Sequence, residues 1–398
     1  MTQTDTSNQT AFLKIQVHSS FLGKYFQPSV KITTGKLSFI QYFEQGAKGT
    51  RYINISPLIS EDEVEIRLKG EQIALDDQIV QLIQFKHQPI KKLNLLVLAP
   101  HPDDAEIAAF GLYSTHPDSY IVTITAGDAG EYKYDEIYPD KIHHYLKKGQ
   151  LRTWNSITIP MLGGIPPQQT LNLGFFDARL KKMFRDKSAP VKGLYTNTSD
   201  INTYRKLNVS RLSAGLSGDS SWNWLVKNLS YLLKEIKPDI IVAPYPALDS
   251  HADHKFSTLA LFEAIKASDI RYGHLYLYSN HLVLNESYPY GKEGGTISLP
   301  PSFGDPIYFD SIYSHPLSSG RQKDKIFVLE AMNDLRPDTE WRFLQGAIKI
   351  SLEKIKQEIM GGNDSYFRRS IRCNEFFFVV KTGNIYNQDI FNRLIGKI

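Results

Sequence analysis

Two short apolar runs, far apart in the sequence, constrain this chain more than any other feature. Leu95–Ala99 leads into Pro-His-Pro-Asp-Asp, and Ile240–Ala243 leads through a Pro-containing turn into His-Ala-Asp-His. Continuous apolar runs of this length are typical of strands that are buried on both faces of a parallel sheet. The carboxyl ends of such strands open onto a shared crevice. If the two strands are neighbours, the pattern predicts that both polar clusters lie in one site.

From residue 93 onward, strand-like and helix-like segments alternate, which predicts an α/β domain. We expect a Rossmann-like, mostly parallel sheet with helices on both faces. The strands are predicted at 93–99, 120–125, 156–162, 239–243, 275–278 and 375–381, and the helices at 104–114, 139–154, 222–236, 252–267, 321–335 and 338–360. The segment 163–220 is rich in Gly, Ser and Asn and is predicted to be a long functional loop.

Residues 11–88 have a different pattern. Short, alternating apolar runs separated by Gly and Pro predict a small β-sandwich, with strands at 12–18, 29–33, 37–43, 52–55, 64–68 and 79–85. We place the domain boundary in the polar stretch 87–92. The predicted organisation is a disordered tail over 1–10, an accessory β-sandwich over 11–88 and the α/β domain over 93–398. Three roles for the sandwich remain open: holding a glycan, packing against the active-site rim, or forming a homo-oligomer.

Composition excludes several classes of protein. Cys373 is the single cysteine, so an internal disulfide or a cysteine zinc site is excluded, and any metal must be held by His and carboxylate. The net charge of +4 is spread along the chain, which gives no reason to expect a nucleic-acid partner. No apolar run reaches the ~18 residues of a membrane span. Met1–Thr10 lacks the apolar core of a signal peptide, so we expect a cytoplasmic protein.

The two polar clusters suit metal-assisted amide hydrolysis. A catalytic zinc commonly takes three protein ligands and keeps one position for water. A neighbouring carboxylate can then accept a proton, and a spare histidine can stabilise an oxyanion. There is a simpler alternative, because Asp at the start of a helix is a common N-cap and suits the helix dipole. His251–His254 could likewise be an exposed loop, and His143 and His144 are expected on a solvated helix face.

Taken together, Ala99–Glu106 and His251–His254 resemble the PIG-L/LmbE-like zinc-dependent deacetylases. This family includes the N-acetylglucosaminyl-phosphatidylinositol de-N-acetylase and the deacetylases of mycothiol and bacillithiol synthesis. The resemblance covers about residues 93 to 280. It implies that zinc, or another divalent metal, is held by His101, Asp104 and His254. It further implies Asp103 as the general base that activates a metal-bound water, His251 as the group that stabilises the tetrahedral intermediate or protonates the leaving amine, and Asp253 as the residue that orients a catalytic histidine.

Three weaker similarities point to substrate contacts. Asp128, Arg152 and Asp177 lie in segments that are similar to those with which the family binds sugar hydroxyls, although Asn155 stands where the family has Glu. The implied function is removal of an acetyl group from an N-acetylated amino sugar or sugar conjugate. Two alternatives are an amidase that acts on another amide-linked sugar conjugate and a non-catalytic carbohydrate-binding scaffold.

Overall fold

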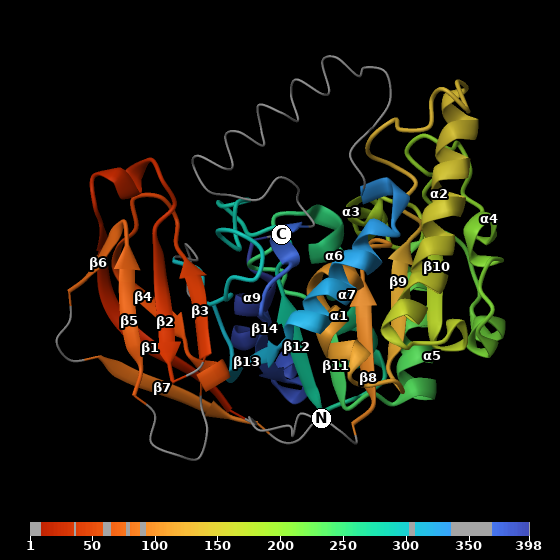
Figure 1. The fold of residues 1–398 in the computed structure, drawn as a ribbon. Coiled ribbons are helices and arrows are strands. Elements are labelled where there is room, and N and C mark those ends of the chain that lie inside the picture. The colour runs from red at the N-terminus through yellow and green to blue at the C-terminus, as the bar shows by residue number, and fades with distance from the viewer. Residues whose placement is uncertain are drawn as a thin grey trace.

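The computed structural model describes residues 9–35, 37–58, 65–76, 80–87, 93–301, 307–335 and 368–397 (Figure 1). The predicted helix over 338–360, residues 1–8 of the predicted tail and most of the predicted boundary at 87–92 lie outside these residues. Within them, no helix has both the length and the apolar character needed to cross a membrane.

The larger part of the chain is a mixed α/β fold, as predicted. Its seven-stranded sheet has the order β10-β9-β8-β11-β12-β14-β13. The strands are β8 (Leu95–Ala99), β9 (Tyr120–Thr125), β10 (Thr170–Phe175), β11 (Ile240–Pro244), β12 (His274–Tyr278), β13 (Ser311–Pro316) and β14 (Asn374–Lys381). The first five strands in that order run parallel, whereas β14 is antiparallel to both β12 and β13.

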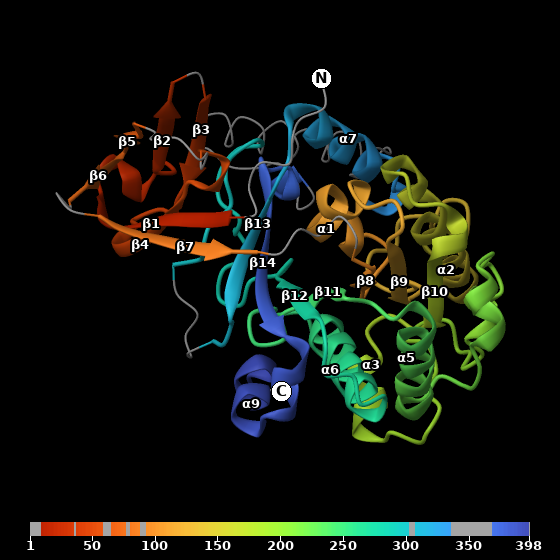
Figure 2. The same cartoon turned by 90° about the horizontal axis from the view of Figure 1, so that it is seen from below.

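Helices cover both faces of this sheet (Figure 2). Helices α1 (Asp104–Ser114) and α7 (Ser319–Glu330) bury apolar side chains against one face. The other face is covered by α5 (Trp222–Ile236) and α6 (Ala252–Ala267), whose leucines and phenylalanines join the larger core cluster. The other α-helices of the described residues are α2 (Lys141–Thr158), α3 (Leu180–Arg185), α4 (Asn202–Arg205) and α9 (Gln388–Ile395). Each apolar stripe therefore has a sheet face to pack on.

The expected pairing of the two motif strands is confirmed. β8 and β11 are direct parallel neighbours, with Ile240 opposite Leu95 and Val242 opposite Val97. From β8 the sheet continues to β9 on one side, and from β11 it continues to β12 on the other. The crevice at such a reversal of strand order is the usual ligand site of an open α/β sheet. Both polar clusters open onto it.

Two predictions between residues 156 and 220 are wrong. The predicted strand 156–162 is the end of α2 followed by a 3-10 turn, Ile159–Gly163. Ile159 is buried in the cluster that contains α1, whereas Met161 and Leu162 are exposed. The strand is β10, which lies inside the predicted loop. Its Leu171, Leu173 and Phe175 alternate with Thr170, Asn172 and Gly174, so it lacks a continuous apolar run, and its register with β9 is irregular after Asn172.

Near the C-terminus, the late strand and the helix near 321–335 are confirmed, although α7 ends at Glu330. Strand β13 was not predicted, because its sequence contains two Ser and ends in His-Pro. Helix α9 was also missed. These two elements complete the antiparallel edge of the sheet and its cover (Figure 2).

The N-terminal residues fold into two antiparallel sheets. One contains β4-β1-β6 with β7 also paired to β1, and the other has the order β3-β2-β5. The strands are β1 (Gln9–Ser19), β2 (Ser29–Thr34), β3 (Leu37–Tyr42), β4 (Lys48–Asn54), β5 (Arg67–Glu71), β6 (Ile73–Leu75) and β7 (Gln81–Lys86). Strand β1 thus begins inside the predicted tail, and β6 was not predicted. Ile15, Val30, Ile32 and Ile53 belong to one buried cluster that both sheets share.

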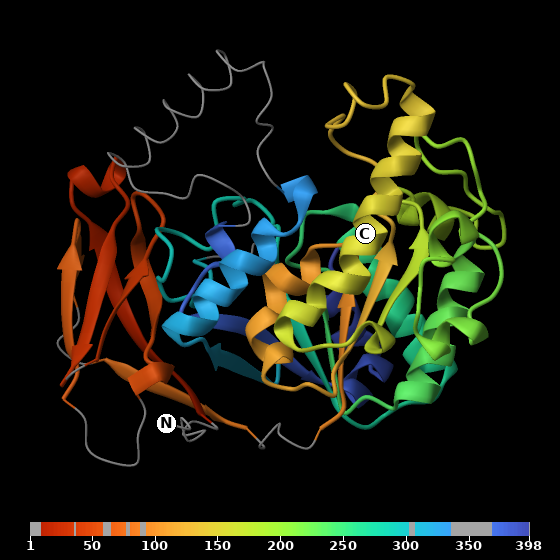
Figure 3. The ribbon, with the colours of Figure 1, turned by 45° about the vertical axis from the view of Figure 1, so that its right-hand side comes forward.

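These sheets lie beside the antiparallel edge of the larger sheet (Figure 1 and Figure 3). Phe12 of β1 packs edge-on against Phe376 of β14, with ring centroids 6.1 Å apart. Thr10 Oγ1 accepts a 2.9 Å hydrogen bond from the backbone amide of Ser314, in edge strand β13. At the opposite edge, Asn208 bonds both the amide and the carbonyl of Asn172 in β10, each at 2.7 Å. Side chains therefore satisfy backbone groups at both ends of the seven-stranded sheet.

Candidate active site

The first motif does not use its carboxylates as helix caps. Asp103 occupies the N-cap position of α1, yet its side chain makes no capping hydrogen bond. Its Oδ2 lies 3.1 Å from Nη2 of Arg152 instead. Asp104 Oδ2 accepts a 3.0 Å hydrogen bond from the backbone amide of His101. Both acids are thus directed at the crevice and away from the orphan amides of the helix.

Three side-chain atoms from the two motifs form a compact triangle. His101 Nδ1 and His254 Nε2 each lie 3.1 Å from Asp104 Oδ2, and the two nitrogens are 3.3 Å apart. A tetrahedral zinc with ligand bonds of about 2.0–2.1 Å requires donor atoms about 3.3 Å apart. The three residues that the resemblance implied as ligands therefore fit such an ion. They are also buried, as a desolvated metal centre requires.

Two further side chains, neither of them predicted from the sequence, orient these donors through hydrogen bonds. Asp249 is fully buried, and its Oδ2 lies 3.0 Å from Nδ1 of His254, which leaves Nε2 of that ring for the triangle. Asn280 Nδ2 donates to the other oxygen of Asp104 at 2.7 Å. Carboxylates and amides in this position fix the tautomer and the rotamer of metal-binding side chains. Asp249 stands two residues before His251 in the second motif, so its signal was present but resembled that of an ordinary turn residue.

More donor atoms converge on the same space. One potential metal-binding group comprises His101, His251 and His254, and another comprises His101, Asp177 and Asp253, with donor atoms within 4.8 Å of one another in each. His101 Nε2 lies 3.2 Å from Asp177 Oδ1, without the direction of a hydrogen bond. His251 Nδ1 is buried and has no hydrogen-bond partner. His101 Nε2 and His251 Nδ1 are thus two buried nitrogens without hydrogen-bond partners in residues that could hold a cation.

The electrostatics agree with that fit. Burial lowers the pKa of His254, but the carboxylates of Asp104 and Asp249 outweigh it and raise this pKa to about 10. Burial likewise opposes the charge of His101, yet Asp177 and Asp104 raise its pKa well above the usual range. The carboxylates thus stabilise positive charge at the triangle. A divalent cation would satisfy the same excess of negative charge.

Arg152 forms the wall beside Asp103. Its guanidinium also approaches Asp334, at 3.5 Å, and Lys148 Nζ lies 3.4 Å from the same carboxylate. Gly127 lets the guanidinium pass, because a Cβ there would lie 2.8 Å from it and the residue has a φ of +66°. The carboxylates of Asp103 and Asp334 therefore balance the positive charges of Arg152 and Lys148. Asp334 had been predicted only as part of a helix.

Asp128, Asp177 and Asp253 organise one turn at the rim. Asp128 Oδ1 accepts from the amide of Asp177 at 2.9 Å, and Tyr204 donates to its other oxygen. Asp253 accepts from the amide of Ala178 at 2.6 Å, while its Oδ2 lies 3.6 Å from His101 Nε2. Asp253 therefore approaches His101, a member of the triangle. Asp128 is almost fully buried, and this burial raises its pKa to about 7. Both of its oxygens contact protein groups.

An aromatic group lies beyond Arg152 along α2. Tyr132 packs against His144 with ring centroids 4.1 Å apart, and Tyr145 stacks on Tyr195 at 4.3 Å. His144 is fully buried and accepts a hydrogen bond from the amide of Tyr134, so the expectation that it is solvated is wrong. Its helix face packs under the loop that follows β9.

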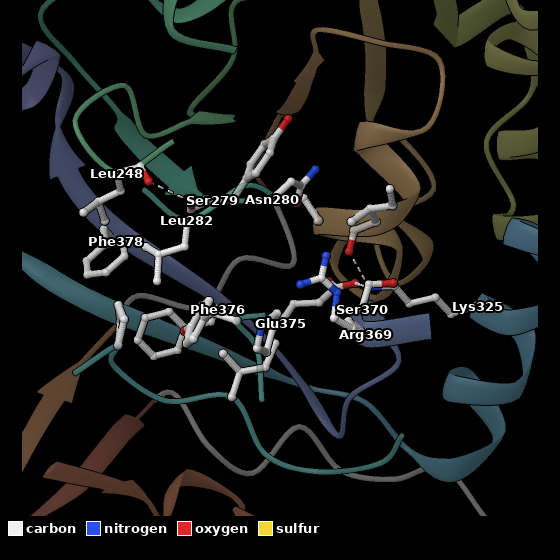
Figure 4. A pocket seen from close by; sticks show the side chains of 17 residues that line it. Leu248, Ser279, Asn280, Leu282, Lys325, Arg369, Ser370, Glu375, Phe376 and Phe378 are labelled. Carbon is white, nitrogen blue, oxygen red and sulfur yellow. Dashed lines mark hydrogen bonds and ion pairs between the residues drawn. The ribbon is translucent and has the colours of Figure 1, made fainter. Parts of the chain in front are cut away.

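A cavity lies on the other side of Asn280 (Figure 4). Its apolar wall includes Leu248, Leu282, Phe376 and Phe378, and α1 contributes Ile107 and Ala108. Asn280 is shared between this cavity and the triangle, since its amide holds Asp104. The cavity therefore borders the candidate metal site.

A family model agrees with the motif. The family model described as PIG-L: GlcNAc-PI de-N-acetylase matches residues 96–265. No curated protein matches the sequence. Similar solved structures include a zinc-inhibited form of teicoplanin deacetylase (14% identity, 72% of this chain and 98% of that chain, TM-score 0.36). They also include the A40926 pseudoaglycone deacetylase (14%, 73% and 99%, 0.37) and the 4-carboxy-2-hydroxymuconate hydratase of Pseudomonas putida (10%, 72% and 95%, 0.37).

The matched region runs from β8 through most of α6, and so includes both motifs and the rim turn between them. The resemblance inferred from the two motifs is confirmed by this family model, which matches residues 96–265.

Proposed function

We propose that this protein is a metal-dependent hydrolase that removes an acetyl group from an N-acetylated amino sugar or sugar conjugate. The observation that carries the proposal is the triangle of His101, Asp104 and His254 with a further carboxylate, Asp103, beside it and outside it. The match to the PIG-L family supports the deacetylase chemistry. Zinc is the proposed ion, and another divalent metal would meet the same donor atoms.

His101, Asp104 and His254 would hold the metal, with Asp249 and Asn280 fixing the orientation of two of them. The bound ion supplies Lewis acidity toward an amide carbonyl and an activated water. Asp103 is the proposed proton acceptor. Its contact with Arg152 keeps the carboxylate in place, and the neighbouring helix start leaves it free of capping bonds.

His251 is the proposed partner of the reacting carbonyl and of the leaving amine. Its ring lies against that of His101, with centroids 4.8 Å apart, and its Nδ1 has no protein partner. A hydrogen-bond donor at this point can stabilise developing negative charge on oxygen. Asp253 is the proposed holder of His101 and of the turn at Ala178.

Arg152 and Asp177 are the proposed contacts to sugar hydroxyls, and Asp128 acts behind them by holding the Asp177 amide. Asp103 and Asp334 balance the charge of Arg152, which favours hydroxyl groups over an anionic substituent. The cavity beyond Asn280 favours a substrate with an apolar part, that is, a conjugate.

For the N-terminal part, we propose an accessory β-sandwich over 11–88 attached to a deacetylase domain over 93–398. Of the roles left open by the sequence, its contacts favour packing against the rim. Asn54 donates to the carbonyl of Ile297, and Ser298 donates to the carbonyl of Tyr52. Ile297 lines the cavity, so the sandwich would support one wall of the substrate site.

The test measures bound metal and acetate release with the purified full chain. We expect about one zinc per chain and acetate release from alkyl glycosides of N-acetylglucosamine, faster than from the free sugar. Asp103→Asn should keep the metal and lower kcat about 10²–10⁴-fold, as expected for loss of a general base. Asp269→Asn, an exposed acid far from the motifs, serves as the matched control. The proposal fails if wild-type protein binds no divalent metal, or if Asp103→Asn leaves the acetate release intact.

The same assay separates the two alternatives. A non-catalytic carbohydrate-binding scaffold would bind the glycosides without releasing acetate. An amidase for a different conjugate would bind metal and release another acid from a matched panel of N-acyl sugars, with N-acetyl substrates inert.

A further inference from the structure

Helix α1, which carries Asp104 in its first turn, is interrupted in the middle. Ala109 has φ −140° and ψ 16°, far from the α-helical values of about −63° and −42°. In a continuous helix the amide of Gly111 would donate to the carbonyl of Ile107. Both groups are buried, so each needs another partner once the helix is broken.

A buried ion pair supplies those partners. Glu375 of β14 accepts from the amide of Gly111 at 2.8 Å and from that of Leu112 at 2.9 Å. Lys325 of α7 donates to the carbonyl of Ile107 at 2.8 Å and to Glu375 at 2.9 Å. The side chains are 1% and 2% exposed, so solvent cannot substitute for either. Figure 4 shows both residues at the wall of the cavity.

The pair thus replaces one helix hydrogen bond by three: the Gly111 amide donates to Glu375, and the Lys325 ammonium donates both to Glu375 and to the Ile107 carbonyl. The signs of the charges suit their positions. The carboxylate faces the amide end of the second half of α1, and the ammonium faces the carbonyl end of the first half.

Gly111 makes this arrangement possible. A Cβ at Gly111 would lie 2.5 Å from Leu317 and 3.1 Å from the Glu375 carboxylate. The side chain from β14 can therefore reach the helix backbone only because residue 111 has none. Stability alone does not require such a pair, since apolar side chains of similar volume often serve as well as a buried ion pair.

We propose that Lys325 and Glu375 are positioning residues that fix the first turn of α1, and with it Asp103 and Asp104, relative to His254 in the first turn of α6. Lys325 donates a hydrogen bond to the carbonyl of Ile107, the last residue of that first turn. The metal-binding triangle tolerates little displacement, because its three atoms come from two separate elements. This inference rests on the proposed function, since metal affinity is the property that the pair would control.

The experiment compares zinc affinity, by competition with a chromophoric chelator, among full-length variants with verified circular dichroism spectra. Lys325→Met and Glu375→Gln should each weaken zinc binding by about 10-fold, the lower end of the range for residues that orient metal ligands. The double variant Lys325→Met/Glu375→Leu leaves no unpaired buried charge, so we expect it to fold with a lower melting temperature than wild type, because the Gly111 amide and the Ile107 carbonyl lose their partners. It should bind zinc about 10-fold more weakly. Lys325→Arg, which keeps a cationic donor, should retain most of the zinc affinity of the wild-type protein.

Arg372→Met is the matched control. Arg372 is also fully buried and donates to backbone carbonyls, but those of Pro289, Gly291, Lys292 and Arg369, away from α1. It should lower the melting temperature without changing zinc affinity. In the cobalt-substituted protein, the visible absorption spectrum should change for the Lys325 and Glu375 variants and not for this control.

Zinc affinity within threefold of wild type in the folded single and double variants would overturn the inference and leave the proposed function standing. A wild-type chain that binds no metal and releases no acetate would instead overturn the proposed function, and this inference with it.

Discussion

Replacement of Asp249 by Asn tests the architecture of the candidate metal site most directly. The Asp249 carboxylate is fully buried, and its Oδ2 lies 3.0 Å from Nδ1 of His254. Its other oxygen accepts from the amide of His251 at 2.9 Å. Asp249→Asn keeps the size and shape of the side chain but removes the charge and one acceptor. An amide nitrogen placed against the His254 ring would also favour the tautomer that carries its proton on Nε2, the atom that faces Asp104.

The size of the effect follows from these contacts. Loss of a hydrogen bond to a charged group costs about 1.5–3 kcal/mol of folding stability. Removal of a carboxylate behind a metal-binding histidine typically costs 10–100-fold in metal affinity, which corresponds to about 1.4–2.8 kcal/mol. Because the altered tautomer would also place a proton on Nε2 of His254, we expect the loss of metal affinity in Asp249→Asn to lie toward the upper end of that range.

Zinc dissociation constants from chelator competition, with melting curves in the presence and absence of EDTA, would measure both quantities. Asp269→Asn provides the control, since Asp269 has a 76% exposed side chain and pairs with Arg271 on the surface. In wild type, EDTA should lower the melting temperature by more than it does in Asp249→Asn. A folded Asp249→Asn protein that binds zinc within threefold of wild type would refute the assignment of His254 Nε2 as a donor.

Three further substitutions test other parts of the structure. Gly127→Ala forces a side chain onto a left-handed backbone and against Arg152. We expect the free energy of unfolding in urea to fall by about 1–2 kcal/mol and the KM in steady-state kinetics to rise. Unchanged kinetics would show that Arg152 does not belong to the substrate site. Phe12→Ala should cost about 3–5 kcal/mol, because this fully buried ring packs between Phe85 and Phe376, and a loss under 1 kcal/mol in urea unfolding would contradict tight packing of the two parts. Asp253→Ala leaves the amides of Ala178 and Leu180 without their acceptor, so Asp177 should shift and kcat/KM should fall by at least tenfold, whereas wild-type kinetics would show that this turn does not depend on Asp253.

The centre of the fold could be predicted from the sequence because the pattern of a strand buried on both faces, a continuous apolar run, is visible within a few residues. Leu95–Ala99 and Ile240–Ala243 are apolar throughout, so each had to be a strand buried on both faces, and the acids that follow them had to lie at one edge of the sheet. Strand β10 was missed because Asn172 and Gly174 separate its apolar residues, so it lacks the continuous apolar run of the two motif strands. Strand β13 contains Ser and ends in His-Pro, which made it look like a loop.

The supporting residues of the site could not be predicted, since their importance depends on contacts between distant segments. Asp334 reaches Arg152 and Lys148 from a short turn after α7, and nothing in its neighbourhood indicates that role. The Lys325–Glu375 pair acts on a helix more than 200 residues earlier in the chain. Only Asp249 had a visible signal, as an acid within the second motif.

The side-chain contacts at the two edges of the large sheet bear on how copies of this chain can associate. An edge strand with unpaired amides and carbonyls is a template on which another chain can add a strand. Here Asn208 imitates such a strand at Asn172, and Thr10 takes up the amide of Ser314 at the far edge. Both ends of the sheet are thus protected against extension at these positions. Association of two copies by strand addition is therefore disfavoured at Asn172 and Ser314, and truncation before β8 would leave the Ser314 amide without the Thr10 hydroxyl.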